Sequence, residues 1–314
     1  MISITEARNR LPSDFIDSLY QNFTDGQVDN IIRGICSKRY QTVRVNTIKY
    51  DIQSLMSYFK ELNIKFERVL WYKDALIIKN KNEQELQNLE IYEKGYFYMQ
   101  SLSSMVPPLV LCPKEGEKVL DLTAAPGSKT TQIACLMNNK GYILANELDK
   151  IRCERLKYNV LLQGATIIDV SNGRGEYIGR NNIENFDKVL LDTPCSGEGR
   201  FDIKNVQSYK NWSKKTVNEL VKMQKKLLKS AYEALKPGGI LVYSTCTLNK
   251  EENEDIVLWA ISNFSLELQN ITLTDIKNSY KGFKINNKFE LEKTIRIIPS
   301  DYMEGFYIAK FRKI

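Results

Sequence analysis

Two cysteines stand in short segments rich in glycine, proline and hydroxyl residues, at 192–199 (DTPCSGEG) and 243–247 (YSTCT). Each segment follows an apolar run that predicts a buried strand, so both thiols are expected just past strand ends. If these strands are neighbours, Cys195 and Cys246 face one crevice. A cysteine thiolate is a strong nucleophile, and this setting favours covalent chemistry. The other four cysteines are interpreted as small apolar residues: Cys36, Cys112, Cys135 and Cys153.

Histidine is absent from all 314 residues. This excludes Ser-His-Asp and Cys-His catalysis and every zinc site that needs imidazole. The cysteines also form no C-x-x-C pair, and no metal site is expected. Acid–base work must therefore fall to Asp, Glu, Lys, Tyr, Cys or the substrate itself.

A loop of small residues at 123–130 (TAAPGSKT) follows the apolar run 118–122 and precedes a helical stretch. It matches neither G-x-G-x-x-G nor a phosphate-binding Walker loop. Glu147 directly follows the next predicted strand, about 20 residues beyond Gly127, an offset at which a carboxylate can bind both hydroxyls of a ribose. Asp192 ends the fourth strand. Together these features indicate a nucleoside ligand without a pyrophosphate, and S-adenosylmethionine fits that description.

Alternating strands and helices must position these segments from about residue 116 onward. Strands are predicted at 118–122, 141–146, 165–170, 186–192 and 240–243, and a long amphipathic helix begins near Ser213. An antiparallel pair is expected at 294–298 and 305–310. This alternation predicts a parallel sheet covered by helices on both faces.

Residues 1–92 break that rhythm, which predicts a separate small α+β domain before an α/β domain at 93–314. The expected elements of the small domain are helices at 13–22 and 52–62 and strands at 43–46, 66–70 and 75–78.

Three segments closely resemble the signature segments of the RNA 5-methylcytosine methyltransferases, the Fmu/Sun/NSUN family. They are residues 120–130, 192–199 and 243–247, and the stretches 44–47, 98–105 and 304–310 are similar to the family as well. The resemblance implies a class I S-adenosylmethionine-dependent methyltransferase fold. This fold is Rossmann-like, with a mostly parallel seven-stranded sheet that ends in an antiparallel hairpin. The implied activity is methyl transfer to C5 of a cytosine in ribosomal or transfer RNA.

The same resemblance implies a division of roles. Cys246 corresponds to the nucleophile that adds to C6 of the base, and Cys195 to a second cysteine that helps to release the enzyme. Asp192 is expected to hydrogen-bond the base, with Lys129 supporting the same network. Cofactor contacts are expected from the following residues: Thr123, Ala124, Ala125, Pro126, Gly127, Ser128, Lys129, Glu147, Asn172 and Asp192.

Residues 171–174 (SNGR) depart from the family pattern, which usually reads Asp-Gly-Arg at this place. Asn172 would then stand where an aspartate accepts from the adenine amino group, a bond that an amide oxygen can also accept. Asp169 lies close enough in sequence to take this role instead, and the sequence leaves both residues open.

A net charge of +7 fits a polyanionic partner. Arg44 and the N-terminal domain resemble the family's RNA-binding module, with domain bounds 1–92 for RNA binding and 93–314 for catalysis. A run of lysines on the long helix offers further phosphate contacts: Lys214, Lys215, Lys222, Lys225, Lys226 and Lys229. No segment resembles a signal peptide or membrane span, so a cytoplasmic protein is expected, with a monomer favoured.

Two other functions stay open at this point. A DNA cytosine-C5 methyltransferase would use the cysteine of a Pro-Cys segment, which here is Cys195. A catalytically silent RNA-binding factor could share the same fold, although both cysteines and Asp192 are retained.

Overall fold

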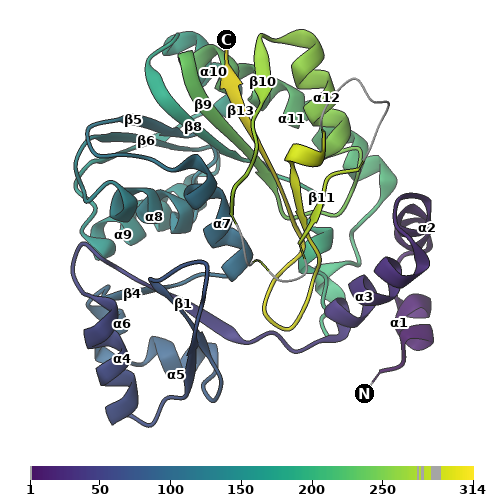
Figure 1. Cartoon of the computed structure of the whole chain (residues 1–314), viewed down its shortest axis with the longest axis horizontal. Coiled ribbons are helices and arrows are strands. Elements are labelled where there is room, and N and C mark those ends of the chain that lie inside the picture. The colour runs from purple at the N-terminus through teal and green to yellow at the C-terminus, as the bar shows by residue number, and fades with distance from the viewer. Residues whose placement is uncertain (1, 274–275, 277–278, 284–290) are drawn as a thin grey trace.

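A mostly parallel sheet forms the centre of the computed structural model, which describes residues 2–273, 276, 279–283 and 291–314 (Figure 1). The strand order is β11-β12-β13-β9-β8-β5-β6-β7, and β10 pairs with β13. Seven of these strands form the predicted fold, with β5 to β9 parallel and the β12–β13 hairpin antiparallel; β10 and β11 are two short additions. The strand bounds are β5 Lys118–Asp121, β6 Tyr142–Glu147, β7 Ile168–Asn172, β8 Phe186–Asp192, β9 Leu235–Thr245, β10 Leu266–Leu268, β11 Ser279–Lys281, β12 Ile295–Ile297 and β13 Phe306–Lys313.

Helices cover both faces of this sheet because the strands are apolar on both sides. Val119 packs into a core with the helices of one face, whereas its neighbour Leu120 packs into the core on the other face. The first face carries α7 Leu102–Leu111, α8 Ser128–Leu136 and α9 Lys150–Gln163, and the second carries α10 Gly175–Asn181, α11 Lys214–Ala234 and α12 Glu254–Asn263. Such burial on both faces is what continuous apolar strands such as β8 require.

A second, four-stranded antiparallel sheet has the order β2-β3-β1-β4 and its own apolar core. Its strands are β1 Gln41–Val45, β2 Phe66–Arg68, β3 Ala75–Ile78 and β4 Phe97–Met99, accompanied by helices α4 Ile52–Glu61, α5 Glu83–Gln87 and α6 Glu90–Glu93. Because β4 pairs with β1, the small sheet extends beyond the boundary predicted at residue 92.

The first three helices lie apart from that small sheet, as Figure 1 shows. They are α1 Ile4–Arg10, α2 Ser13–Asn22 and α3 Asp25–Cys36. Their apolar faces pack with Phe201, Leu248 and Ile298 of the large domain. Residues 1–92 therefore do not form one body, because this helical segment shares its core with residues that follow both cysteines.

Candidate active site

The two cysteine segments are neighbours because β8 and β9 pair in parallel, with Asp192 opposite Ser244. The Sγ atoms of Cys195 and Cys246 lie 3.1 Å apart. A short helical turn, η1 Glu198–Arg200, docks on the second segment, where the Gly199 amide donates to the Cys246 carbonyl at 3.0 Å. The structure thus brings together the two thiols that the strand-end argument placed in one crevice.

The environment distinguishes the two thiols. The hydrogen bond from Cys195, aided by the nearby Arg200 guanidinium, lowers the pKa of Cys246 although burial opposes it. That same hydrogen bond, together with burial, raises the pKa of Cys195. These shifts favour Cys195 as the donor in the contact and make Cys246 the more readily deprotonated of the two thiols. Since the thiolate is the reactive form, Cys246 is the better nucleophile of the pair.

Asp192 and Lys129 form an ion pair beside the cysteines, with Lys129 Nζ 2.7 Å from Asp192 Oδ2. Lys129 also donates to the hydroxyl of Ser104 at 2.8 Å, and Ser244 donates to the other oxygen of Asp192 at 2.7 Å. The Thr123 hydroxyl donates to the Asp192 backbone carbonyl at 2.9 Å. The loop after β5 and the segment after β8 are thus directly joined.

The predicted cofactor loop runs from Thr123 to Gly127, and Ser128 and Lys129 follow in the first turn of α8. Gly127 precedes the helix with φ +104°, and a Cβ there would lie 2.9 Å from Leu156 Cδ1. The positive φ favours glycine here, whereas the leucine side chain could shift to admit a Cβ. Ala124 and Ala125 are buried, Pro126 is exposed, and the Ala125–Pro126 peptide is cis.

Glu147 and Asn172 lie side by side at the carboxyl ends of β6 and β7. Glu147 is almost completely buried, and one of its oxygens accepts from the Asp149 amide at 2.9 Å. The amide nitrogen of Asn172 donates to the carbonyls of Glu147 and Leu148, which leaves its side-chain oxygen to accept from a ligand. Asp169 lies three residues before Asn172 in β7, where its partner in β6 is Leu144. Of the two candidates, only Asn172 stands at the edge that holds the other site residues.

Several polar residues at this site escaped the sequence argument. Ser244 and Ser104 complete the Asp192–Lys129 network, and two buried glutamates, Glu198 and Glu252, lie behind the cysteine segments. Burial and the charge of Glu252 raise the pKa of Glu198 to about 7. Their positions could have indicated three of them, because Ser104, Glu198 and Ser244 lie within segments that resemble the family.

Arg44 does not contact solvent, which contradicts its interpretation as an RNA-binding residue. It is completely buried, and its guanidinium donates to Gln100 Oε1 at 2.9 Å and to Thr131 Oγ1 at 3.0 Å. It therefore fastens the small sheet to α8. The sequence shows that Arg44 is charged but not that it is buried. A buried arginine and a phosphate-binding arginine therefore cannot be told apart at that level.

The lysines of α11 lie on the side of the helix away from its buried residues. Lys214, Lys215, Lys222, Lys226 and Lys229 are exposed, whereas Lys225 is half-buried and lies over the Trp259 ring at 5.4 Å. The apolar stripe of α11 faces the sheet, so this basic face remains accessible.

Within the described residues, no group of His, Cys, Asp and Glu side chains could hold a metal ion. Among those same residues, no helix is long and apolar enough to cross a membrane.

The sequence model of the 16S rRNA methyltransferase RsmB/F family matches residues 108–312. The chain belongs to this family. Ribosomal RNA small subunit methyltransferase F of Shewanella loihica is 34% identical over 312 residues, covering 97% of this chain and 63% of its own length. The Vibrio atlanticus protein of the same name is 38% identical over 278 residues, covering 87% of this chain and 58% of its own. The chain thus spans about three-fifths of the length of these curated relatives.

A solved structure, a methyltransferase homolog protein from Pyrococcus horikoshii, superposes with a TM-score of 0.84 at 32% identity. The match covers 100% of both chains. The class I methyltransferase fold expected from the sequence is confirmed.

Proposed function

We propose that this chain transfers a methyl group from S-adenosylmethionine to C5 of a cytosine in RNA. The observation that carries the proposal is the pair of thiols 3.1 Å apart beside the Asp192–Lys129 ion pair, with the pKa lowered at Cys246 and raised at Cys195. Membership of a family named for rRNA methylation supports it.

The residues after β5, β6 and β7 fit S-adenosylmethionine. The buried carboxylate of Glu147 suits the two ribose hydroxyls, and the side-chain oxygen of Asn172 suits the adenine amino group. The small residues from Thr123 to Gly127 let the ligand approach the backbone, and no phosphate-binding loop competes with this use. S-adenosylmethionine supplies a methyl group on a sulfonium, which is electrophilic.

Cys246 activates the base, since C5 of cytosine is a poor carbon nucleophile. Addition of the Cys246 thiolate to C6 converts the ring into an enamine whose C5 can accept the methyl group. Asp192, held by Lys129 and Ser244, hydrogen-bonds the N3/N4 edge of the base and offsets the charge of the adduct. Once C5 has lost its proton, Cys195 assists the elimination that frees Cys246.

The same electrostatics disfavour the DNA-type alternative. Cys195 would have to act as the nucleophile there, yet the hydrogen bond with Cys246 and burial raise its pKa. A silent RNA-binding factor would have no use for this polarised pair of thiols.

We infer that the substrate is ribosomal RNA of the small subunit, because both curated relatives carry that name. We further propose that the protein acts in the cytoplasm, where the ribosomes are, and that it acts as a monomer. The target base must leave its stack to reach Cys246. The small sheet and the basic face of α11 would contact the phosphates, which would make binding salt-dependent.

The test is methyl transfer from tritiated S-adenosylmethionine to 16S rRNA, small subunits and transfer RNA, with nucleoside digestion to locate the label. Label in 5-methylcytidine is expected, and Cys246→Ala should abolish it. Normal activity of Cys246→Ala with an inactive Cys195→Ala would contradict the assignment of the nucleophile. No label in any RNA would leave the silent factor as the better account.

A further inference from the structure

A fully buried carboxylate that the mechanism above does not use joins the two cysteine segments. Oε1 of Glu252 accepts from the Ser196 amide at 3.0 Å, and Oε2 accepts from the Ser196 hydroxyl. That hydroxyl lies 2.7 Å from the hydroxyl of Thr247. Ser196 directly follows Cys195, and Thr247 directly follows Cys246. The connection therefore lies one residue away from each thiol.

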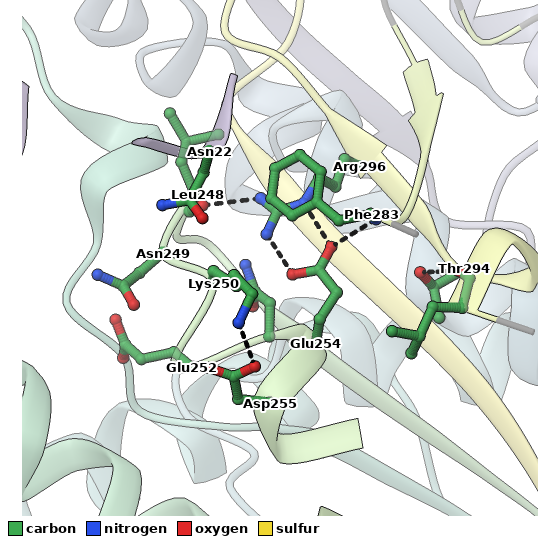
Figure 2. Close-up of polar contacts among 12 residues, drawn as sticks. Asn22, Leu248, Asn249, Lys250, Glu252, Glu254, Asp255, Phe283, Thr294 and Arg296 are labelled. Atoms are coloured by element: carbon green, nitrogen blue, oxygen red, sulfur yellow. Dashed lines mark hydrogen bonds and ion pairs between the residues drawn. The ribbon is translucent and has the colours of Figure 1, made fainter. Parts of the chain in front are cut away.

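Glu252 is itself fixed from two further elements. Gln224 of α11 donates to Glu252 Oε1 at 2.8 Å and to the Pro194 carbonyl at 3.0 Å. Tyr243 of β9 donates from its hydroxyl to the Glu252 carbonyl at 2.6 Å. Figure 2 shows that the carboxylates of Glu252 and Glu254 point in different directions, the latter toward Arg296. Glu252 and Glu254 therefore bind different partners, Ser196 and Arg296 respectively.

The distance between the two sulfur atoms matters because the charges around them do not by themselves favour a thiolate. Asp192 of β8 and Glu304, just before β13, oppose a negative charge on Cys246, whereas Arg200 of η1 favours it. Glu252 likewise opposes a thiolate at Cys195. The hydrogen bond from Cys195 is the largest influence that lowers the pKa of Cys246, and its strength depends on the spacing of the two segments.

We propose that Glu252 is a positioning residue, which clasps Ser196 and Thr247 so that the Cys195 thiol stays in hydrogen-bond contact with Cys246. The clasp does not touch the substrate. The catalytic role of these Glu252 contacts rests on the proposed function, whereas their effect on the two thiols can be measured without any methyl transfer.

The test is the rate of Cys246 alkylation by iodoacetamide against pH, followed by mass spectrometry of the peptide that contains Cys246. Glu252→Gln keeps the size of the side chain but cannot accept all three hydrogen bonds. The midpoint of its profile should rise by about one pH unit, which slows alkylation by about tenfold at pH values well below the wild-type midpoint. Methyl transfer should lose kcat with little change in KM for S-adenosylmethionine. Glu251→Gln, the partly exposed neighbour, is the matched control and should keep the wild-type profile.

Two further variants guard against a merely structural effect. Ser196→Ala removes one hydroxyl and should shift the profile in the same direction but less far. In a Cys195→Ala background the donor to Cys246 is gone, so Glu252→Gln should then produce no additional shift. Unchanged profiles in folded Glu252→Gln and Ser196→Ala, or a shift that persists without Cys195, would overturn the proposal. Failure of the wild type to methylate RNA would instead count against the proposed function alone.

Discussion

Replacement of Arg296 by methionine should strongly destabilise the fold. Arg296 and Glu254 form an ion pair in which both side chains are fully buried (Figure 2). Arg296 Nε lies 2.7 Å from Glu254 Oε1, Nη2 contacts Oε2, and Nη1 donates to the Leu248 carbonyl at 2.7 Å. The pair therefore links β12 to the start of α12 and to the chain just after Cys246.

The size of the effect follows from the charge that is left behind. Arg296→Met leaves the Glu254 carboxylate buried without its counter-ion, a change that costs about 3–5 kcal/mol. The guanidinium also lies 4.2 Å from the centre of the Phe283 ring, a contact worth about 1 kcal/mol. We expect a loss of about 4–6 kcal/mol in the free energy of unfolding, measured by urea denaturation followed by tryptophan fluorescence.

The neighbouring ion pair in Figure 2 provides the control. Lys250 and Asp255 are both partly exposed, so Lys250→Met should cost at most about 1 kcal/mol. The double variant Arg296→Met/Glu254→Leu removes both charges and should regain most of the stability. If Arg296→Met loses no more than Lys250→Met, the reasoning from burial is refuted.

Three further predictions concern the fold around the site. Gly199→Ala should impair both stability and methyl transfer, because its Cβ would lie 2.0 Å from the Gly305 carbonyl oxygen; Gly26→Ala, which meets open space, is the control, and equal behaviour of the two in urea titrations would contradict the packing argument. Burial raises the pKa of Asp121 from 3.8 to about 7, so folding favours its protonated form, and stability should fall as pH rises from about 4 to 7, by up to about 1.4 kcal/mol per unit. Asp121→Asn should flatten that fall, measured by urea titration at each pH, and an unchanged slope would show that Asp121 is not its source. Arg44→Met should lower stability yet leave the salt dependence of RNA binding by filter assay unchanged; a shallower salt slope would restore Arg44 as a phosphate contact.

The sequence was sufficient to predict the central sheet, because its strands carry continuous apolar runs. The predicted strand at 186–192 coincides with β8, and the helix expected from Ser213 is α11. At the end of α11 the pattern was less informative. The helix end indicated by Lys236-Pro237-Gly238 is confirmed, since α11 ends at Ala234, but the strand predicted at 240–243 already begins at Leu235 because it pairs with β8 there.

Contacts between distant segments could not be predicted in the same way. The packing of α1 to α3 on the large domain depends on Phe201 and Ile298, which no local pattern connects to residues 4–36. For the same reason Arg44 resembled a phosphate contact and Glu252 attracted no notice. Arg44 bonds to Gln100, 56 residues away, and Glu252 bonds to Gln224, 28 residues away. Only folding brings these partners together.

The central claim, that Cys246 attacks the base and Cys195 releases it, is tested most directly by trapping the covalent intermediate. Cys195→Ala incubated with S-adenosylmethionine and 16S rRNA should accumulate a protein–RNA adduct that survives denaturing electrophoresis. Nuclease digestion and peptide mass spectrometry should place the attached nucleotide on Cys246, and Cys195→Ala/Cys246→Ala should form no adduct. An adduct that instead accumulates in Cys246→Ala, with the nucleotide on Cys195, would contradict the account.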